Sequence, residues 1–179
     1  MATTYNNLYL DIRQQLRRAG IEEATLEARE LVCFGTNKSR EELARDGGLY
    51  ASPELEHRVR DLVRRHLEGE PVAYLIGEWE FYGLPLDISR DVLIPRPETA
   101  ELVELIVEEN PNARRLLDIG TGSGCIAISL DKKLPDAEVE AWDISEEALA
   151  IARKNNDALE ARVRFLQRDV LADDWEKIP

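Results

Sequence analysis

The sequence predicts an α/β fold in which a small helical bundle is followed by a β-hairpin and then by alternating strands and helices. Three observations predict this order. Apolar residues recur every three or four positions in residues 1–75, as on the buried side of amphipathic helices. Two β-forming runs flank a Gly-Leu-Pro break at 83–85. From residue 114, short apolar strands alternate with helical segments, which is typical of a parallel sheet.

Two helices are expected first. One begins after the threonine pair at 3–4, which can cap it, and ends at Gly20. Its apolar stripe is formed by Leu8, Ile12 and Leu16. The second runs over about 22–34, and we expect Gly35 to end it. Its inward-facing residues are predicted to be Leu26, Leu31 and Phe34.

Two more helices carry clear start signals. Ser39 and Glu42 have the spacing of a capping box, and Ser52-Pro53 supplies a cap followed by proline at the first helical position. The fourth helix ends at Gly69. Its polar face carries Arg58, Arg60, Arg64 and Arg65. Two interpretations of this face stay open: a solvated surface, or a contact for an acidic partner.

The pattern then changes to a hairpin, a helix over about 97–109, and a β-α-β-α-β series. We expect the strands at 114–119, 139–144 and 162–170 and the helices at 123–133 and 146–156. The chain is accordingly divided into a helical domain (1–75), a hairpin linker (76–96) and an α/β domain (97–179).

Charge is distributed unevenly along the chain. Residues 1–75 hold 13 acidic and 11 basic side chains, a net charge of −2, whereas residues 76–179 hold 23 and 12, a net charge of −11. An acidic α/β half disfavours a broad nucleic-acid surface, which needs clustered Lys and Arg.

Other classes are disfavoured by composition. No apolar run approaches the roughly 20 residues that span a bilayer, and the N-terminus lacks the pattern of a secretory signal. Cys33 and Cys125 are isolated, and the two histidines, His57 and His66, form no cluster with them. We therefore expect a cytoplasmic protein with buried thiols and no metal site.

The segment that carries the chemistry is Asp118-Ile-Gly-Thr-Gly-Ser-Gly124, between the first strand and its helix. Glycines at every second position let the backbone turn tightly and approach a ligand, and the helix start offers unpaired N–H groups. Asp143 and Asp169 are expected to end the next two strands. All three acids should therefore face the crevice where open α/β sheets bind ligands.

The glycines also fit the G-x-G-x-x-A pattern of NAD-binding turns, a weak signal by itself. Asp118 argues against NAD, because a carboxylate beside the turn would repel a pyrophosphate. S-Adenosylmethionine carries a cationic sulfonium and an α-ammonium, which the acid would attract directly or through water. We therefore favour S-adenosylmethionine as the cofactor.

The segment DIGTGSG, together with WDIS and the EEAL that follows it, resembles motifs I and II of class I methyltransferases. The stretch 69–104, which includes LIPRPET at 93–99, closely resembles the peptide chain release factor glutamine methyltransferases of the HemK/PrmC family. The resemblance covers nearly the whole chain and implies the first half of a Rossmann-like class I methyltransferase domain. Ala100 departs from the family, which usually has another acid there.

The resemblance implies roles for individual residues. The methionine end of the cofactor would be held by Gly120, Thr121, Gly122, Ser123 and Gly124. Asp143 would hold the ribose, and Asp169-Val170 would lie beside the adenine, although Val170 replaces a frequent aromatic residue and leaves stacking in doubt. The family motif near the pocket is formed by Pro95, Arg96, Pro97 and Glu98, without individual roles.

The family's catalytic Asn-Pro-Pro-Tyr does not occur in the sequence and would fall beyond Pro179. The family reaction methylates the GGQ glutamine of class 1 release factors, whose amide nitrogen is a poor nucleophile. There, the Asn side chain and a proline carbonyl fix that nitrogen. We expect this chain to be an inactive fragment, whose first strand lies at an open sheet edge that can self-associate.

Three alternatives remain at this point. A ribosomal-protein glutamine methyltransferase shares the core motifs, although the helical region favours the release factor branch. A nucleic-acid methyltransferase is disfavoured by the acidic charge. A non-catalytic adaptor would bind a release factor through residues 1–75.

Overall fold

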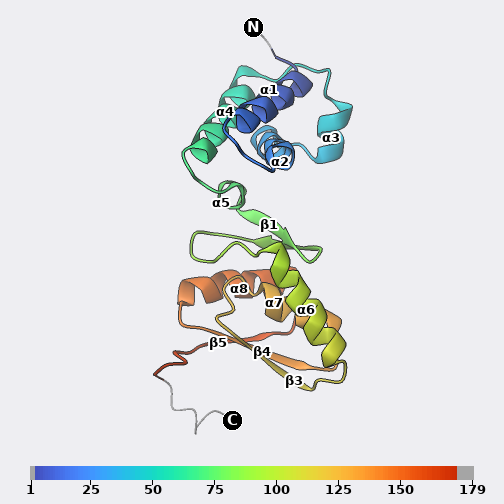
Figure 1. Ribbon diagram of the computed structural model, residues 1–179, viewed down its shortest axis with the longest axis vertical. Coiled ribbons are helices and arrows are strands. Elements are labelled where there is room, and N and C mark those ends of the chain that lie inside the picture. Colours follow the sequence, from blue (N-terminus) through green and yellow to red (C-terminus); the bar gives the residue numbers. More distant parts are fainter. Residues whose placement is uncertain (1–2, 173–179) are drawn as a thin grey trace. The chain divides into compact units, whose positions relative to one another are not determined.

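The computed structural model describes residues 3–172, shown in Figure 1. The chain divides into two compact units, Met1–Ile76 and Gly77–Pro179. Each unit has its own buried apolar core. The hairpin that we expected as a linker belongs to the second unit.

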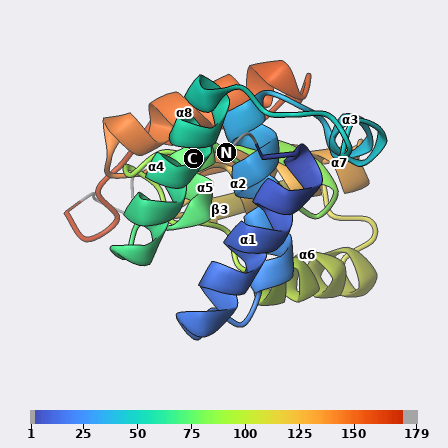
Figure 2. The ribbon, with the colours of Figure 1, turned by 90° about the horizontal axis from the view of Figure 1, so that it is seen from above.

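The first unit consists of helices. They are α1 (Tyr5–Arg18), α2 (Ala24–Thr36), α3 (Arg40–Arg45), α4 (Pro53–Leu67) and the short α5 (Val72–Ile76), which was not predicted from the sequence. Helices α1, α2 and α4, seen from above in Figure 2, contribute buried side chains to a common core. Its fully buried side chains include Leu8, Ile12, Leu16, Leu31 and Val59.

The predicted start signals are confirmed. The Thr4 hydroxyl accepts the Asn7 N–H at 3.2 Å, and the Ser52 hydroxyl accepts the Leu55 N–H at 3.3 Å. The reciprocal capping box of α3 is present. These caps satisfy backbone donors that a helix start leaves unpaired.

Two predictions for α2 are wrong. Gly35 lies inside the helix, which continues to Thr36 and ends at Asn37 in the left-handed conformation, φ +56°. Gly35 is there for packing, because a Cβ at this position would lie 2.5 Å from the Val59 Cγ2 of α4. Leu26, expected to face inward, is 38% exposed.

Three of the four arginines on the polar face of α4 pair with acids of their own unit, and Arg58 lies over the ring of Phe34. Arg60 pairs with Glu56 and with Asp11 of α1. Further pairs are Arg64 with Asp61 and Glu68, and Arg65 with Glu70. These contacts favour the solvated-surface interpretation over a contact for an acidic partner, since a partner would have to compete with acids already in place.

The second unit begins with the hairpin of β1 (Glu78–Phe81) and β2 (Leu84–Asp87). Tyr82 and Gly83 form its turn with φ of +54° and +75°, as in the tight turns that suit twisted hairpins. Helix α6 (Pro97–Glu109) follows at the predicted position.

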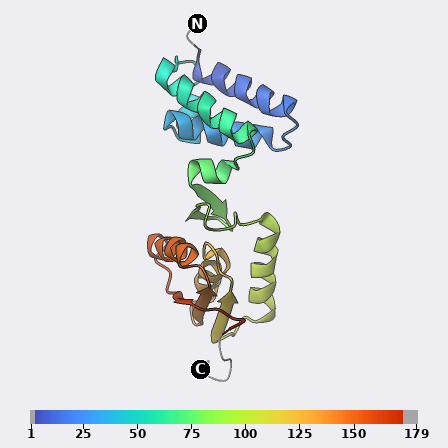
Figure 3. The same ribbon diagram turned by 90° about the vertical axis from the view of Figure 1, so that its left-hand side faces the viewer.

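The sheet of this unit is parallel, as predicted. Its strands β3 (Arg115–Ile119), β4 (Glu138–Asp143) and β5 (Arg164–Gln167) lie in the order β3-β4-β5. Helices α7 (Cys125–Lys133) and α8 (Glu146–Ala158) lie on the same side of it (Figure 1). In the turned view of Figure 3, α6 and α8 lie on opposite sides of the unit.

The other face of the sheet is open in the described part of the chain. Leu117 and Ile119 of β3 point to this face and are 45% and 48% exposed. A depression of about 560 Å³ lies over β3 and β4. Within residues 3–172, β3 pairs with β4 alone and is therefore an edge strand, as expected. No helix in this range has the length and apolar character needed to cross a bilayer.

Candidate cofactor site

The glycine loop lies between β3 and α7, where its backbone is held by the neighbouring strand. The amides of Gly120 and Thr121 both donate to the Trp142 carbonyl, at 2.8 and 3.0 Å. Gly120, Gly122 and Gly124 all have positive φ, between +55° and +81°, a region that disfavours residues with a Cβ. The alternation of glycines in the sequence therefore follows from the path of this turn.

The three glycines differ in their surroundings. A Cβ on Gly120 or Gly122 would meet no atom within 4 Å, so the space above the turn is open. A Cβ on Gly124 would lie 3.2 Å from the Ala152 Cβ and 3.1 Å from the Ile128 Cδ1. Gly124 therefore allows α7 and α8 to approach each other, whereas the first two glycines leave room for a ligand.

Asp143 ends β4 and is bonded directly to the loop. Its Oδ2 accepts the Gly122 N–H at 2.9 Å, and its Oδ1 accepts the Ser145 N–H at 3.0 Å. The carboxylate is thus fixed between the glycine turn and the start of α8. Each oxygen keeps a second lone pair for a ligand hydroxyl.

Asp118 lies on the other side of the same turn. Its Oδ2 accepts the Thr121 hydroxyl at 2.7 Å. Burial, and to a smaller extent the charge of Asp143, raise the pKa of Asp118 above that of an ordinary aspartate. No ion pair with Asp118 or Asp143 occurs within residues 3–172. The turn therefore brings together two carboxylates that no cation of the described chain neutralises.

Asp169, the third predicted acid, has a different hydrogen-bond partner from Asp118 and Asp143. Strand β5 ends at Gln167, so Asp169 lies two residues beyond the strand instead of ending it. Its Oδ1 accepts the Leu171 N–H at 3.0 Å in a local turn. Val170 is half-buried beside it.

The predicted motif before α6 forms the start of that helix. Pro95 is buried, Arg96 is its extended N-cap residue, and Pro97 is its first residue. Arg96, Pro97 and Glu98 are exposed. Their roles at the pocket stay predictions.

The residues at the turn fit S-adenosylmethionine. Open space lies above Gly120 and Gly122, and two unneutralised carboxylates flank it, which suits a ligand with cationic groups. Asp143 is an acceptor placed at a strand end, where nucleotide folds hold ribose hydroxyls. Among residues 3–172, no cluster of His, Cys, Asp and Glu side chains could bind a metal ion.

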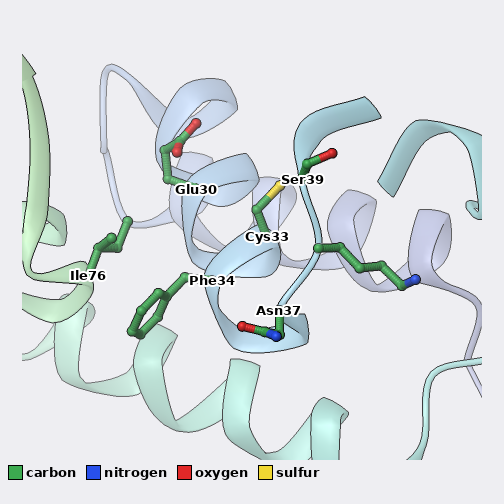
Figure 4. Close-up of a pocket in the computed structure, with 7 residues that line it drawn as sticks. Glu30, Cys33, Phe34, Asn37, Ser39 and Ile76 are labelled. Atoms are coloured by element: carbon green, nitrogen blue, oxygen red, sulfur yellow. The ribbon is translucent and has the colours of Figure 1, made fainter. Parts of the chain in front are cut away.

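A different pocket, of about 340 Å³, lies in the first unit (Figure 4). It is lined by Glu30, Cys33, Phe34, Asn37, Lys38, Ser39 and Ile76. Cys33 is a buried free thiol whose pKa burial raises, so it is a weak nucleophile at neutral pH. Cys125 is likewise buried, with its pKa raised mainly by burial. None of the predicted site residues lines this pocket.

Sequence reasoning assigned no role to Asn155, which the structure connects to the glycine loop. Its side chain, 1% exposed, donates to the Ser123 carbonyl at 2.9 Å. The available signal was a polar residue on the apolar face of α8, a position where Asn is unfavourable without a partner.

A glycine turn after the first strand, held to an acid that ends the neighbouring parallel strand, is typical of Rossmann-like class I methyltransferases, whose cofactor is S-adenosylmethionine. This chain has their fold. Comparison with protein families supports a narrower assignment: residues 7–77 match the PrmC N-terminal domain, and residues 97–178 match the methyltransferase small domain. Over most of its length, the chain is similar to the release factor glutamine methyltransferases.

Several curated relatives carry that name. The one from Bacteroides thetaiotaomicron is 64% identical over 116 residues, which are 65% of this chain and 42% of the relative. The one from Koribacter versatilis is 40% identical over 161 residues, which are 89% of this chain and 58% of the relative. The chain thus spans about half the length of the curated relatives it matches.

Among solved structures, the tRNA (uracil-54, C5)-methyltransferase of Pyrococcus abyssi in complex with S-adenosyl-L-homocysteine is similar. It has a TM-score of 0.44 and 20% identity, and the match covers 51% of this chain and 23% of that chain.

Proposed function

We propose that the glycine loop of this chain binds S-adenosylmethionine, and that the protein to which it belongs methylates the GGQ glutamine of class 1 peptide chain release factors. The observation that carries the first part is the pair of half-buried carboxylates, Asp118 and Asp143, hydrogen-bonded to the same open glycine turn. The relatives' names support the second part.

Electrostatics favours this cofactor over a dinucleotide. Bound S-adenosylmethionine would supply a methyl group on a positively charged sulfur. Asp118 would lie near the cationic methionine end, and Asp143 would accept hydrogen bonds from the ribose hydroxyls. A pyrophosphate crossing the same turn would meet two carboxylates instead, and like charges so close together repel strongly. Asp169 and Val170 are proposed to border the adenine.

Isothermal titration calorimetry on the 179-residue chain tests the cofactor. We expect S-adenosylmethionine to bind more tightly than S-adenosylhomocysteine, which lacks the positive sulfur, and NAD not to bind. Tighter binding of NAD than of S-adenosylmethionine would contradict the proposal.

The methylation step is tested with a protein of the relatives' full length, a purified release factor and methyl-labelled cofactor. Label on the GGQ glutamine is expected, and binding without label would support an adaptor instead. The 179-residue chain alone should transfer no methyl group, because its sequence contains no Asn-Pro-Pro-Tyr.

The helical unit is proposed to recognise the release factor, and release factors act on ribosomes, so the reaction belongs in the cytoplasm. Direct binding of nucleic acid is not part of the proposal. Charge reversal at Arg64 and Arg65 tests the α4 face. Because both arginines already pair with acids of their own unit, we expect release factor affinity to stay unchanged.

The 179-residue chain is also proposed to self-associate through β3. An edge strand exposes unpaired N–H and C=O groups, and Leu117 and Ile119 add exposed apolar area next to that edge. Light scattering should show a mass that rises with concentration. Leu117→Lys with Ile119→Lys should shift the chain to monomer, whereas Leu49→Lys, at an exposed leucine of the first unit, should not. A monomeric unsubstituted chain would contradict this proposal.

A further inference from the structure

Asn155 is a buried polar residue on the apolar face of α8, where its position in the helix does not call for a polar side chain. It is 1% exposed and lies on the face that also buries Leu149 and Ala152. A polar side chain costs stability there unless it is fully hydrogen-bonded. An apolar residue could fill the space without that requirement, so the partners of Asn155 indicate its role.

The side-chain amide bonds two segments that are distant in the sequence. Its Nδ2 donates to the Ser123 carbonyl at 2.9 Å and to the Asp87 carbonyl at 3.1 Å, while its Oδ1 accepts the Asp87 N–H at 2.7 Å. The exchange with Asp87 closes a two-bond ring with the backbone at the end of β2. Both donors of the amide are used, which fixes which end is nitrogen, because a flipped amide would face two carbonyls with its oxygen.

The bond to Ser123 acts on the glycine loop. The peptide unit between Ser123 and Gly124 has its carbonyl held by Asn155, and its N–H donates to the Thr121 carbonyl at 2.9 Å. That peptide is therefore held from both sides. It lies directly between Gly122, which binds Asp143, and the first residue of α7.

We infer that Asn155 is a positioning residue for the cofactor site, which holds the glycine loop in its ligand-accepting conformation by anchoring it to the end of the hairpin. This inference rests on the proposed function for the identity of the ligand, but the anchoring itself can be measured without a ligand. Asn155 does not touch the open side of the turn, and acts through the Ser123–Gly124 peptide.

A matched pair of isosteric substitutions separates this role from a general effect of added charge. Asn155→Asp keeps an oxygen for the Asp87 N–H but turns a second oxygen toward two carbonyls. Asn156→Asp adds the same charge at the next residue, and it keeps the oxygen that accepts the Val163 N–H at 3.1 Å. We expect Asn155→Asp to weaken S-adenosylmethionine binding by about tenfold and Asn156→Asp to change it by less than about twofold.

Amide hydrogen exchange without ligand gives a second readout. In the unsubstituted chain, the Asp87 amide should be protected by its bond to the side chain of Asn155. In Asn155→Asp that protection should persist, while the Gly124 amide exchanges faster. Equal acceleration throughout α8 and the sheet would show a merely structural role and overturn the inference.

The two proposals can fail separately. If S-adenosylmethionine does not bind the unsubstituted chain, the proposed function fails. The exchange rates of the Gly124 and Asp87 amides still test the role of Asn155. If Asn155→Asp does not fold, hydrogen exchange of the unsubstituted chain tests the inference. Exchange of its Asp87 amide at the rate of an unstructured peptide would overturn the inference.

Discussion

Asp118 illustrates a conflict between stability and binding in one side chain. Burial next to Asp143 disfavours its charged form in the free protein, whereas a cationic ligand needs that form. Its oxygen also accepts the Thr121 hydroxyl, a bond that a neutral amide can accept as well. One substitution of Asp118 by asparagine can therefore separate the effect of its charge on cofactor binding from the effect of its side-chain shape.

We predict that Asp118→Asn weakens S-adenosylmethionine binding by about ten- to a hundredfold, the range for losing an interaction with a charged group. The free variant should be as stable as the unsubstituted chain at neutral pH, or more stable, because the buried charge is gone. Calorimetry and thermal unfolding measure the two quantities. A variant that binds normally would contradict the role of this charge.

The raised pKa of Asp118 sets the direction of the pH dependence. The cofactor needs the ionised carboxylate, so affinity should fall as pH drops through this raised pKa, at a higher pH than for an ordinary aspartate. The free protein responds oppositely: the stability contribution of Asp118 is fully present below its unfolded-state pKa and is lost as pH rises through the folded-state pKa. Titrations across acidic pH should show less dependence in Asp118→Asn.

The crossing of α2 and α4 depends on a glycine that does not serve as a helix end. Gly35 faces Val59 so closely that a Cβ would lie 2.5 Å from its Cγ2 and 3.1 Å from its Cα. The helices must therefore move apart if any side chain is placed there. Helix propensity alone favours alanine over glycine by about 0.5–1 kcal/mol, so packing and propensity make opposite predictions.

We predict that Gly35→Ala destabilises the first unit, because overpacking costs about 1–3 kcal/mol and exceeds the gain in propensity. In the background of Val59→Ala, the same substitution should cost less, since Cγ2 is then absent, although the close Cα remains. Chemical denaturation followed by far-ultraviolet circular dichroism measures the double-mutant cycle. A stabilising effect of Gly35→Ala alone would show that the helices separate freely.

Across the whole molecule, charge and tryptophan are both concentrated in the second half of the sequence. Residues 76–179 carry a net charge of −11, against −2 for residues 1–75. All three tryptophans, Trp79, Trp142 and Trp175, also belong to this half. Tryptophan fluorescence, excited selectively over tyrosine, therefore reports on the acidic half alone, whereas circular dichroism also reports on the N-terminal helices.

We predict that salt stabilises the acidic half selectively. Self-repulsion of like charges opposes compaction, and about 0.1 M salt shortens the screening length to about 10 Å. The midpoint of thermal unfolding by tryptophan fluorescence should rise as sodium chloride increases, with little change in the helical transition of the first unit. A fluorescence midpoint that falls with salt would indicate that attractive pairs dominate instead.

Much of the fold could be predicted because its signals are local. Capping residues at Thr4, Ser39 and Ser52 act within one helical turn, so sequence spacing is enough to identify them. The glycine turn is similar, since positive φ restricts the residue type wherever it occurs. The parallel direction of β3, β4 and β5 could be predicted from the alternation of strands and helices.

The features that the sequence mispredicted, left open or missed depend on neighbours distant in sequence. Gly35 has the signal of a helix end, but its use is set by Val59, 24 positions later. The α4 arginines could have faced a partner, and acids of the same unit, among them Asp11 of α1, pair with them instead. Asn155 gained a role only because folding placed it against Asp87 and Ser123.

The sequence by itself determined the succession of helices and strands, the glycine turn and Asp118 just before it, because backbone conformation and capping are set within a few residues. Folding decided which carboxylates share the turn, which glycine serves packing instead of ligand approach, and which side chain anchors the loop. Those outcomes depend on distances between segments that the order of residues does not specify.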